Sequence, residues 1–292
     1  MINFSIVLFL IARIIANPLG QFFSKKLSKE IPCSVICFYS YLLLSLSYFP
    51  FIKKYIQPET ITPDLITLVI IAGVLSILGT LFFIKSEEDE KISAITPDNS
   101  FISIVGLFFA YILLNELPSI IAMLGILLIF TGSKIISDNP FHFSFPELKR
   151  KEVQYKLISF LFAAAQVVVL KKIIIYSSIE TCFILWCFIC CILSFLVLFV
   201  SKRTLKFDYR IHLMPLMIIA ICIGFMQYAA NYVLNNMNVV YALSLFQLSS
   251  IFTSFAGFKS FNKKEIIRKT IAACIMVCGS IFIVYLLTVY MI

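Results

Sequence analysis

Long apolar runs recur along the whole chain, and they constrain its fold more than any other feature. Each run is roughly 18 to 24 residues long, the length that a helix needs to cross a bilayer. The period-two pattern of a membrane β-barrel is absent, so the sequence predicts an all-α integral membrane protein with ten transmembrane helices. The predicted spans are 4–23, 34–52, 65–84, 92–114, 118–137, 155–176, 180–201, 211–234, 239–259 and 267–290.

Composition supports a membrane location. The chain is 61% hydrophobic and 13% charged, with a mean hydropathy of +1.01, whereas soluble domains of this length carry far more charge. A net charge of +9 suggests a nucleic-acid partner in a soluble protein, but here Lys and Arg are expected to anchor helix ends. We therefore expect the lipid bilayer as a partner and no nucleic acid. The nine cysteines mostly lie in predicted spans and are expected to pack as small apolar residues, so neither a metal nor a cofactor is predicted.

The basic residues are unevenly distributed between the two ends of the predicted spans. Loops 1–2, 3–4, 5–6, 7–8 and 9–10 carry most of them, and the positive-inside rule then places these loops in the cytoplasm and both termini outside. The first span has no small-residue cleavage site after it, so we expect it to be retained in the cell (inner) membrane. The opposite end has little more than Lys53, Lys54, Lys171 and Lys172.

The two halves of the sequence resemble each other at an offset of about 147 residues. Residues 103–136 parallel residues 250–283, and Gly132 falls on Gly279. Five helices per repeat is an odd number, so the second copy must run through the membrane upside down. Inverted repeats around a site at the bilayer midplane are typical of transporters.

The repeat divides the chain into three parts. We predict a first five-helix repeat over 1–138, a polar linker over 139–153 and a second five-helix repeat over 154–292.

The first predicted span contains a polar stripe. Arg13, Asn17 and Gln21 are spaced four residues apart, so they share one face of a helix that Pro18 is expected to kink. A charge within a span costs several kcal/mol on the gentler scales, which favours a face that lines a water-filled cavity. The alternative is that Arg13 extends toward the interface or pairs structurally within the bundle.

The fourth predicted span contains the one carboxylate that lies inside a span and away from its ends. Asp98 is followed by Asn99, and two roles are open for the aspartate. It pairs with Arg13, or it binds a coupling proton. A nearby arginine lowers the pKa of a carboxyl group, so pairing with Arg13 argues against proton binding near neutral pH.

The second half supplies uncharged polar side chains within its spans. They can hydrogen-bond a substrate, and they can equally bridge helices, which contributes under about 1 kcal/mol each in membranes. Together with Arg13 and Asp98 they suit a small polar or zwitterionic solute, with Arg13 at its carboxylate or phosphate. The candidate residues are Gln166, Gln227, Tyr228, Asn231, Ser244 and Gln247.

The sequence at the end of the fourth predicted span and in the fifth resembles that of a known family. The segments LLNELPS and LGILLIFTGS, and in the second half VVYALSLFQLSSIFTSFAGFKSFNKK and CIMVCGSIFIVY, are similar to EamA-type members of the drug/metabolite transporter superfamily. The resemblance covers nearly the whole chain. It implies a single-chain exporter that works by alternating access, is driven by protons or by solute exchange, and has a cavity lined mainly by helices 1, 3, 4, 6, 8 and 9.

Two features depart from the family pattern. Glu116 matches the acidic residue that follows the fourth helix, but its counterpart in the second half is Lys263. Members are often drawn with both termini in the cytoplasm, which is opposite to the orientation that the loop charges favour.

The sequence therefore predicts a secondary active transporter of a small polar or zwitterionic metabolite or drug. A translocator of lipids or lipid-linked sugars is the alternative within transport. An intramembrane enzyme would need a nucleophile with a base, or a metal cluster, and His142 and His212 make no such set. Polar residues within the spans argue against a scaffold, and no Walker motif is present for ATP hydrolysis. The sequence leaves open whether the chain forms a homodimer.

Overall fold

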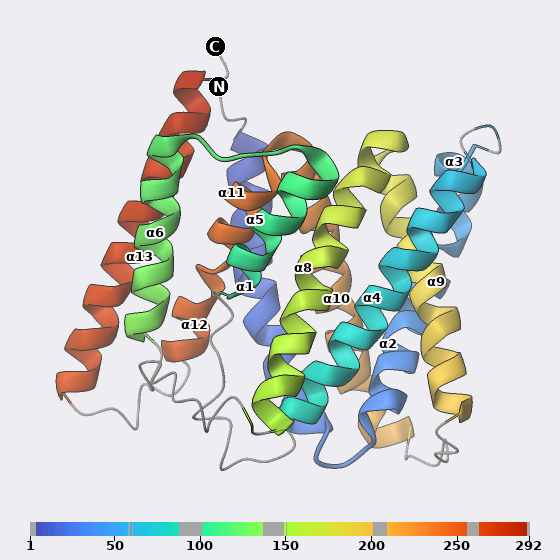
Figure 1. Cartoon of the computed structure of the whole chain (residues 1–292). Coiled ribbons are helices and arrows are strands. Elements are labelled where there is room, and N and C mark those ends of the chain that lie inside the picture. The colour runs from blue at the N-terminus through green and yellow to red at the C-terminus, as the bar shows by residue number, and fades with distance from the viewer. Residues whose placement is uncertain are drawn as a thin grey trace.

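The computed structural model describes residues 4–57, 59, 61–87, 101–136, 149, 151–200, 209–255 and 263–290. Within these ranges the chain is helical and contains no strand, so the predicted all-α fold is confirmed there (Figure 1). The helices are α1 (Phe4–Leu27), α2 (Cys33–Tyr48), η1 (Phe49–Phe51), α3 (Ile52–Tyr55), α4 (Pro63–Glu87), α5 (Phe101–Leu114), α6 (Ile120–Ile136), α8 (Lys151–Tyr176), α9 (Ile179–Val200), α10 (Tyr209–Asn236), α11 (Val239–Phe246), α12 (Ser249–Phe255) and α13 (Lys263–Tyr290).

Seven segments in the described part are long and apolar enough to cross a membrane. They are Phe4–Ser24, Cys33–Tyr55, Pro63–Phe83, Val153–Tyr176, Ile179–Val200, Ile211–Asn236 and Lys264–Tyr285. Three further apolar segments in the described part are shorter: Ile102–Leu114, Ile120–Ile136 and Val239–Ser254. Most ends agree with the predicted spans to within about four residues, which is the expected precision of boundaries read from a sequence.

Four of the helices begin at a polar side chain that accepts a hydrogen bond from a backbone N–H group of the first turn. Such a cap satisfies one of the donors that a helix start leaves without an intrahelical partner. The caps lie at the upper end of the bundle in Figure 1, where α4, α6, α9 and α11 begin. They are Thr62 to Leu65 (3.2 Å), Ser119 to Ala122 (3.2 Å), Ser178 to Thr181 (3.1 Å) and Asn238 to Val240 (2.8 Å).

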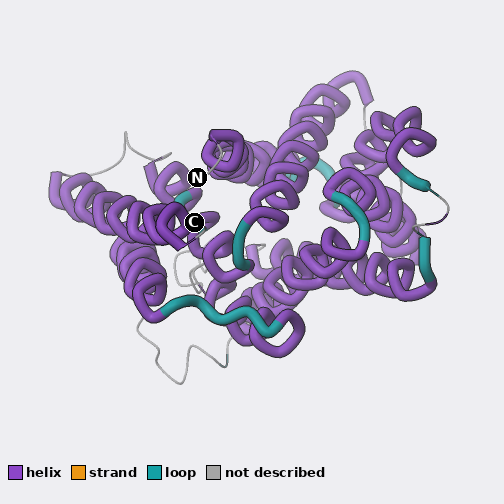
Figure 2. Tube along the Cα trace, turned by 90° about the horizontal axis from the view of Figure 1, so that it is seen from above, coloured by secondary structure: helices purple, strands orange, loops and turns teal. Residues whose placement is uncertain are grey.

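The most extensive helix contacts join segments that are far apart in the sequence. They are the pairs α4 with α8, α6 with α13, and α1 with α10. The pair formed by α6 and α13 stands at one edge of the bundle and touches the remaining helices mainly through α11 and α12 (Figure 1). Figure 2, seen from above, shows the helices standing side by side with the described loops at their ends.

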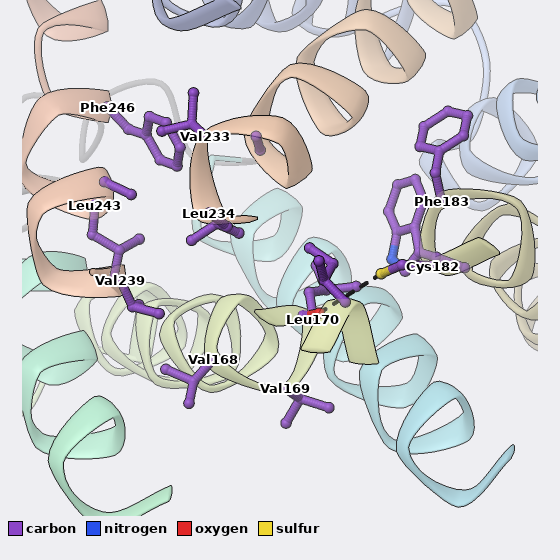
Figure 3. Packing of buried hydrophobic residues seen from close by; sticks show 14 of the residues in the cluster. Val168, Val169, Leu170, Cys182, Phe183, Val233, Leu234, Val239, Leu243 and Phe246 are labelled. Carbon is purple, nitrogen blue, oxygen red and sulfur yellow. Dashed lines mark hydrogen bonds between the residues drawn. The ribbon is translucent and has the colours of Figure 1, made fainter. Parts of the chain in front are cut away.

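The largest hydrophobic cluster contains residues of both halves, and Figure 3 shows the part of it that lies on α8 to α11. Val168, Leu170 and Cys182 of α8 and α9 are fully buried, as are Val233 of α10 and Val239 of α11 (Figure 3). These side chains fix α10 and α11 against α8, and so they set the position of the polar groups that the same helices carry.

The ninth predicted span is interrupted, whereas the sequence predicts one helix over 239–259. α11 ends at Phe246, and a turn at Gln247–Leu248 precedes α12. Across this turn the backbone bonds run from residue i to residue i−3, as in a 3₁₀ helix: the N–H groups of Gln247 and Ser250 donate to Ser244 and Gln247 at 3.1 and 2.9 Å. A short 3₁₀ stretch inside a helix often marks a functional hinge.

α1 shows no comparable interruption. It runs as one helix from Phe4 to Leu27 through Pro18, where a kink was predicted from the missing backbone donor.

All nine cysteines are free in the structure. Cys274 and Cys278, one turn apart on α13, are exposed, whereas the other seven are buried or half-buried.

Candidate functional site

The polar stripe of α1 faces the second half of the chain. The Nη1 group of Arg13 donates to the carbonyl oxygen of Met226 on α10 at 3.1 Å, and Asn17 Nδ2 donates to Ser249 Oγ on α12 at 3.2 Å. Gln21 Nε2 donates to Asn17 Oδ1 at 3.3 Å, one turn along the same face. All three side chains are half-buried. The stripe therefore links α1 to two helices that lie more than 200 residues further along the chain.

Arg13 is a cation inside a membrane span, and its charge is compensated in an unusual way. Its guanidinium carbon lies 3.9 Å from the centroid of the Phe246 ring, at the end of α11. Its Nε atom is buried and has no hydrogen-bond partner. Among the described residues no carboxylate lies within ion-pair distance of it, and Asp98, its predicted partner, lies outside them together with Asn99. One carbonyl and one aromatic face thus stabilise a full positive charge.

α10 contributes a buried pair of amides. Gln227 Nε2 donates to Asn231 Oδ1 at 3.0 Å, and Asn231 Nδ2 is buried without a partner. Tyr228 turns to a different neighbour: its hydroxyl donates to Glu180 Oε1 on α9 at 3.3 Å, and its ring meets Phe183 edge-on. Two of the three predicted residues on α10 therefore lie in the interior, and the third contacts α9.

The turn between α11 and α12 brings Gln247 to α5. Its Nε2 group donates to Ser103 Oγ at 3.4 Å, and the glutamine side chain is buried. Ser244 Oγ donates to the carbonyl of Val240 at 2.8 Å within α11, so its hydroxyl is engaged by its own helix. Gln166 lies half-buried on α8 and has no hydrogen bond to another described residue.

The structure thus brings together part of the predicted set. Arg13, Asn17, Gln21 and Gln247 make contacts that join α1, α5, α10, α11 and α12, and the buried amides of Gln227 and Asn231 lie on α10. Gln166, Tyr228 and Ser244 do not take part in these contacts. Residues that the sequence did not single out as site residues are Ser103, Met226, Phe246 and Ser249. Ser249 and Ser103 could have been found from the sequence, because they are polar residues within apolar spans. Nothing in the apolar pattern distinguishes Phe246 from the other phenylalanines.

A second polar junction ties the two halves together at the start of α11. Lys171 Nζ of α8 lies 2.5 Å from Glu116 Oε1 and donates to the Met237 carbonyl at 2.7 Å. Glu116 Oε2 accepts from the N–H group of Val239 at 2.8 Å. Asn115, in the left-handed conformation at φ 53°, ends α5 directly before Glu116. The sequence counts Lys171 among the basic residues at helix ends, but its side chain is buried in this junction.

The described residues offer no constellation for metal chemistry. No group of three or more His, Cys, Asp or Glu side chains could hold an ion within the described ranges. What the arrangement presents is a set of hydrogen-bond donors and one cation, which can bind a solute without covalent chemistry.

Comparison with known proteins shows a similarity to one family over the first part of the chain. Residues 4–137 match the model of the EamA-like transporter family, and no curated protein matches the chain. A crystal structure described only as that of a protein is similar with a TM-score of 0.73 at 12% sequence identity, over 97% of this chain and 98% of the other. At that identity the likeness concerns the fold alone. Over residues 4–137, this multi-pass membrane protein is thus similar to the EamA-like transporter family of the drug/metabolite transporter superfamily.

Proposed function

We propose that the protein is a secondary active transporter that exports a small polar or zwitterionic metabolite or drug by alternating access. The observation that carries the proposal is Arg13: it is a cation within a span, it has no carboxylate partner among the described residues, and it lies against helices of the second half. An ionisable residue within a membrane protein's interior marks a substrate or ion pathway more often than a structural contact.

The helix pairs support an architecture of two inverted five-helix repeats, with ten spans when the three shorter apolar segments are counted. In such an architecture α1 corresponds to α8, and α4 corresponds to α10. Exchanging the repeats converts the pair α1 with α10 into the pair α8 with α4, and both are among the most extensive in the bundle. The pair α6 with α13 is converted into itself, as is the pair α2 with α9. Self-complementary contacts of this kind are what a two-fold axis produces.

The contact between α6 and α13 supports the same symmetry at residue level. A Cβ atom at Gly125 would lie 2.8 Å from the Gly279 carbonyl oxygen, and one at Gly132 would lie 2.8 Å from the Ala272 carbonyl oxygen. The repeat offset of about 147 residues carries Gly125 onto Ala272 and Gly132 onto Gly279. Each contact is therefore the image of the other. We propose that the repeats cover 1–138 and 154–292, with 139–153 as the linker, whose last residues from Lys151 on form the start of α8.

The interrupted helix supports a site between the repeats. Transporters bind substrates near the bilayer midplane, where discontinuous helices expose polar backbone and side-chain groups. The turn at Gln247–Leu248 lies between Phe246, which contacts Arg13, and Ser249, which contacts Asn17. We propose that the substrate-binding residues are Arg13, Asn17, Gln21, Gln227, Asn231 and Gln247, with Asp98 and Asn99 as candidates outside the described residues. A proton or an exchanged solute is the proposed driving partner.

Thermal unfolding in detergent tests the proposal against a panel of amino acids, nucleosides, sugars and organic cations. A ligand that binds the folded state at a hundredfold excess over its Kd adds about 2.7 kcal/mol, which raises the unfolding midpoint by roughly 5 to 10 °C. We expect such a compound to stabilise the wild-type chain and the control Lys264→Gln, which removes an exposed charge from α13. Arg13→Gln is expected to lose the shift. A shift of equal size in Arg13→Gln would contradict the assignment of Arg13.

A further inference from the structure

The Phe246 ring packs against the guanidinium group of Arg13. The ring lies on the guanidinium at 3.9 Å, and its side chain is only 7% exposed. Phe246 is the last residue of α11, directly before the turn at Gln247–Leu248. Phe246 belongs to the same buried hydrophobic cluster as Val233 and Leu234 of α10, all three labelled in Figure 3, so the ring is packed in the interior of the bundle.

The hydrogen bonds of the guanidinium divide it into a used and an unused edge. Nη1 donates to the Met226 carbonyl. Nη1 lies on the Cδ side of the guanidinium, whereas the Nε–H bond points to the opposite side, where Nη2 lies. Nε is buried and has no partner, and the described residues supply no acceptor to Nη2. Nε and Nη2 together form a fork whose two N–H groups point the same way, and this fork matches two oxygen atoms of a carboxylate or phosphate.

Stacking and in-plane hydrogen bonding are compatible, because an aromatic ring covers the face of a guanidinium and leaves its edges open. Phe246 on one face and Met226 on one edge together restrict the rotation of the Arg13 plane. A fork that is already oriented loses less side-chain entropy when it binds an anion.

A second buried group without a hydrogen-bond partner lies on α10, and like Arg13 Nε it is an N–H donor. Asn231 is fully buried, its Oδ1 atom accepts from Gln227, and its Nδ2 atom has no partner. Buried side-chain groups left unpaired on α1 and α10 are thus N–H donors, which call for a ligand that accepts. A buried polar group without a partner costs about 1–3 kcal/mol, so a ligand that satisfies it gains affinity.

We propose that Arg13 binds an oxyanion, either a carboxylate or a phosphate, side-on through its Nε–Nη2 edge, and that Phe246 is the residue that positions this edge. The inference rests on the proposed function, because it specifies the chemistry of the substrate group that the same site binds. It adds a requirement for geometry to the requirement for charge: lysine cannot replace Arg13, and an apolar residue without an aromatic face cannot replace Phe246.

The experiment uses two probes, inorganic phosphate and acetate, with chloride at matched ionic strength as the reference. The protein is labelled with ¹⁵N at arginine Nε, which gives signals from its five arginines, and the Arg13 signal is assigned by its loss in Arg13→Lys. We expect phosphate or acetate to shift the Arg13 Nε–H signal and chloride not to shift it. The probe that acts distinguishes a phosphate from a carboxylate.

Two further sets of variants separate geometry from charge and packing. Arg13→Lys is expected to lose binding at least tenfold although it keeps the charge. Phe246→Leu is expected to weaken binding several-fold, and Phe246→Tyr, which keeps an aromatic face, is expected to restore it to within about twofold. Phe252→Leu, the same substitution at an exposed position of α12, is the matched control and leaves binding unchanged.

The outcomes separate the two proposals. If Arg13→Lys binds the probe as tightly as the wild type while Arg13→Gln does not, the positive charge alone is sufficient for binding. The proposed side-on geometry would then be wrong, whereas the proposed transport function would not be affected. Equal binding by Phe246→Leu and the wild type overturns the positioning role. If neither probe moves the Arg13 Nε–H signal, the oxyanion inference is overturned, whereas a stabilising compound in the metabolite panel would still support transport.

Discussion

Replacing Lys171 with methionine is expected to lower the midpoint of thermal unfolding in detergent by roughly 6 to 12 °C. The change keeps the length and apolar stem of the side chain but leaves Glu116 without its cation and the Met237 carbonyl without its donor. Removing one partner of a buried ion pair costs about 3 kcal/mol or more, because the remaining charge stays buried and uncompensated. For a chain of this size each kcal/mol corresponds to roughly 2–4 °C.

A neighbouring lysine provides the control. Lys172 is half-buried on the same helix and pairs with no carboxylate among the described residues, so Lys172→Met is expected to change the midpoint by less than about 2 °C. The double variant Lys171→Met with Glu116→Gln leaves no unpaired charge, and the glutamine oxygen still accepts from Val239. It is expected to be more stable than Lys171→Met alone. Equal losses for the Lys171 and Lys172 variants would show that the junction contributes no stability.

Replacing Gly279 with alanine is expected to lower the unfolding midpoint by roughly 4 to 8 °C. An added Cβ would lie 2.6 Å from the backbone oxygen of Gly125 and 2.9 Å from the Leu128 Cβ, so the two helices must separate. Insertion of a carbon atom into a closely packed contact costs about 1–3 kcal/mol. The measurement is thermal unfolding in the same detergent.

Gly79→Ala is the matched control, because a Cβ there would meet its nearest atom, Phe162 Cβ, at 3.5 Å, an ordinary contact. Alanine is favoured over glycine within a helix by about 0.5–1 kcal/mol, so this variant is expected to be as stable as the wild type or slightly more stable. If Gly279→Ala behaved in the same way, the close approach of α6 and α13 would not contribute to stability in detergent.

Much of the fold could be predicted because span length and apolar composition are local properties. The ends of α6, α9 and α10 lie within two residues of the predicted spans, since polar residues cluster at the ends of helices that cross a bilayer. The face of α1 that carries Arg13, Asn17 and Gln21 follows from helical spacing in the same way.

The contacts of these faces could not be predicted from local patterns. The turn at Gln247–Leu248 lies in an apolar stretch without glycine or proline, so the sequence contains no signal that would end α11 there. The stack of Phe246 on Arg13 and the junction of Glu116 with Lys171 depend on which helices pack together across the two halves. Such long-range partners are set by tertiary packing, which spacing within one helix does not encode.

The exposure of Cys274 and Cys278 has a practical consequence for spectroscopy. Both thiols lie one turn apart within the span Lys264–Tyr285, on a face of α13 that is exposed to lipid or detergent, and the remaining cysteines are buried or half-buried. A bifunctional spin label that bridges positions four residues apart on a helix can therefore be attached rigidly to the native polypeptide. With a second label on another helix, pulsed dipolar distances would then measure whether the α6–α13 pair moves relative to the rest of the bundle when a candidate substrate is added.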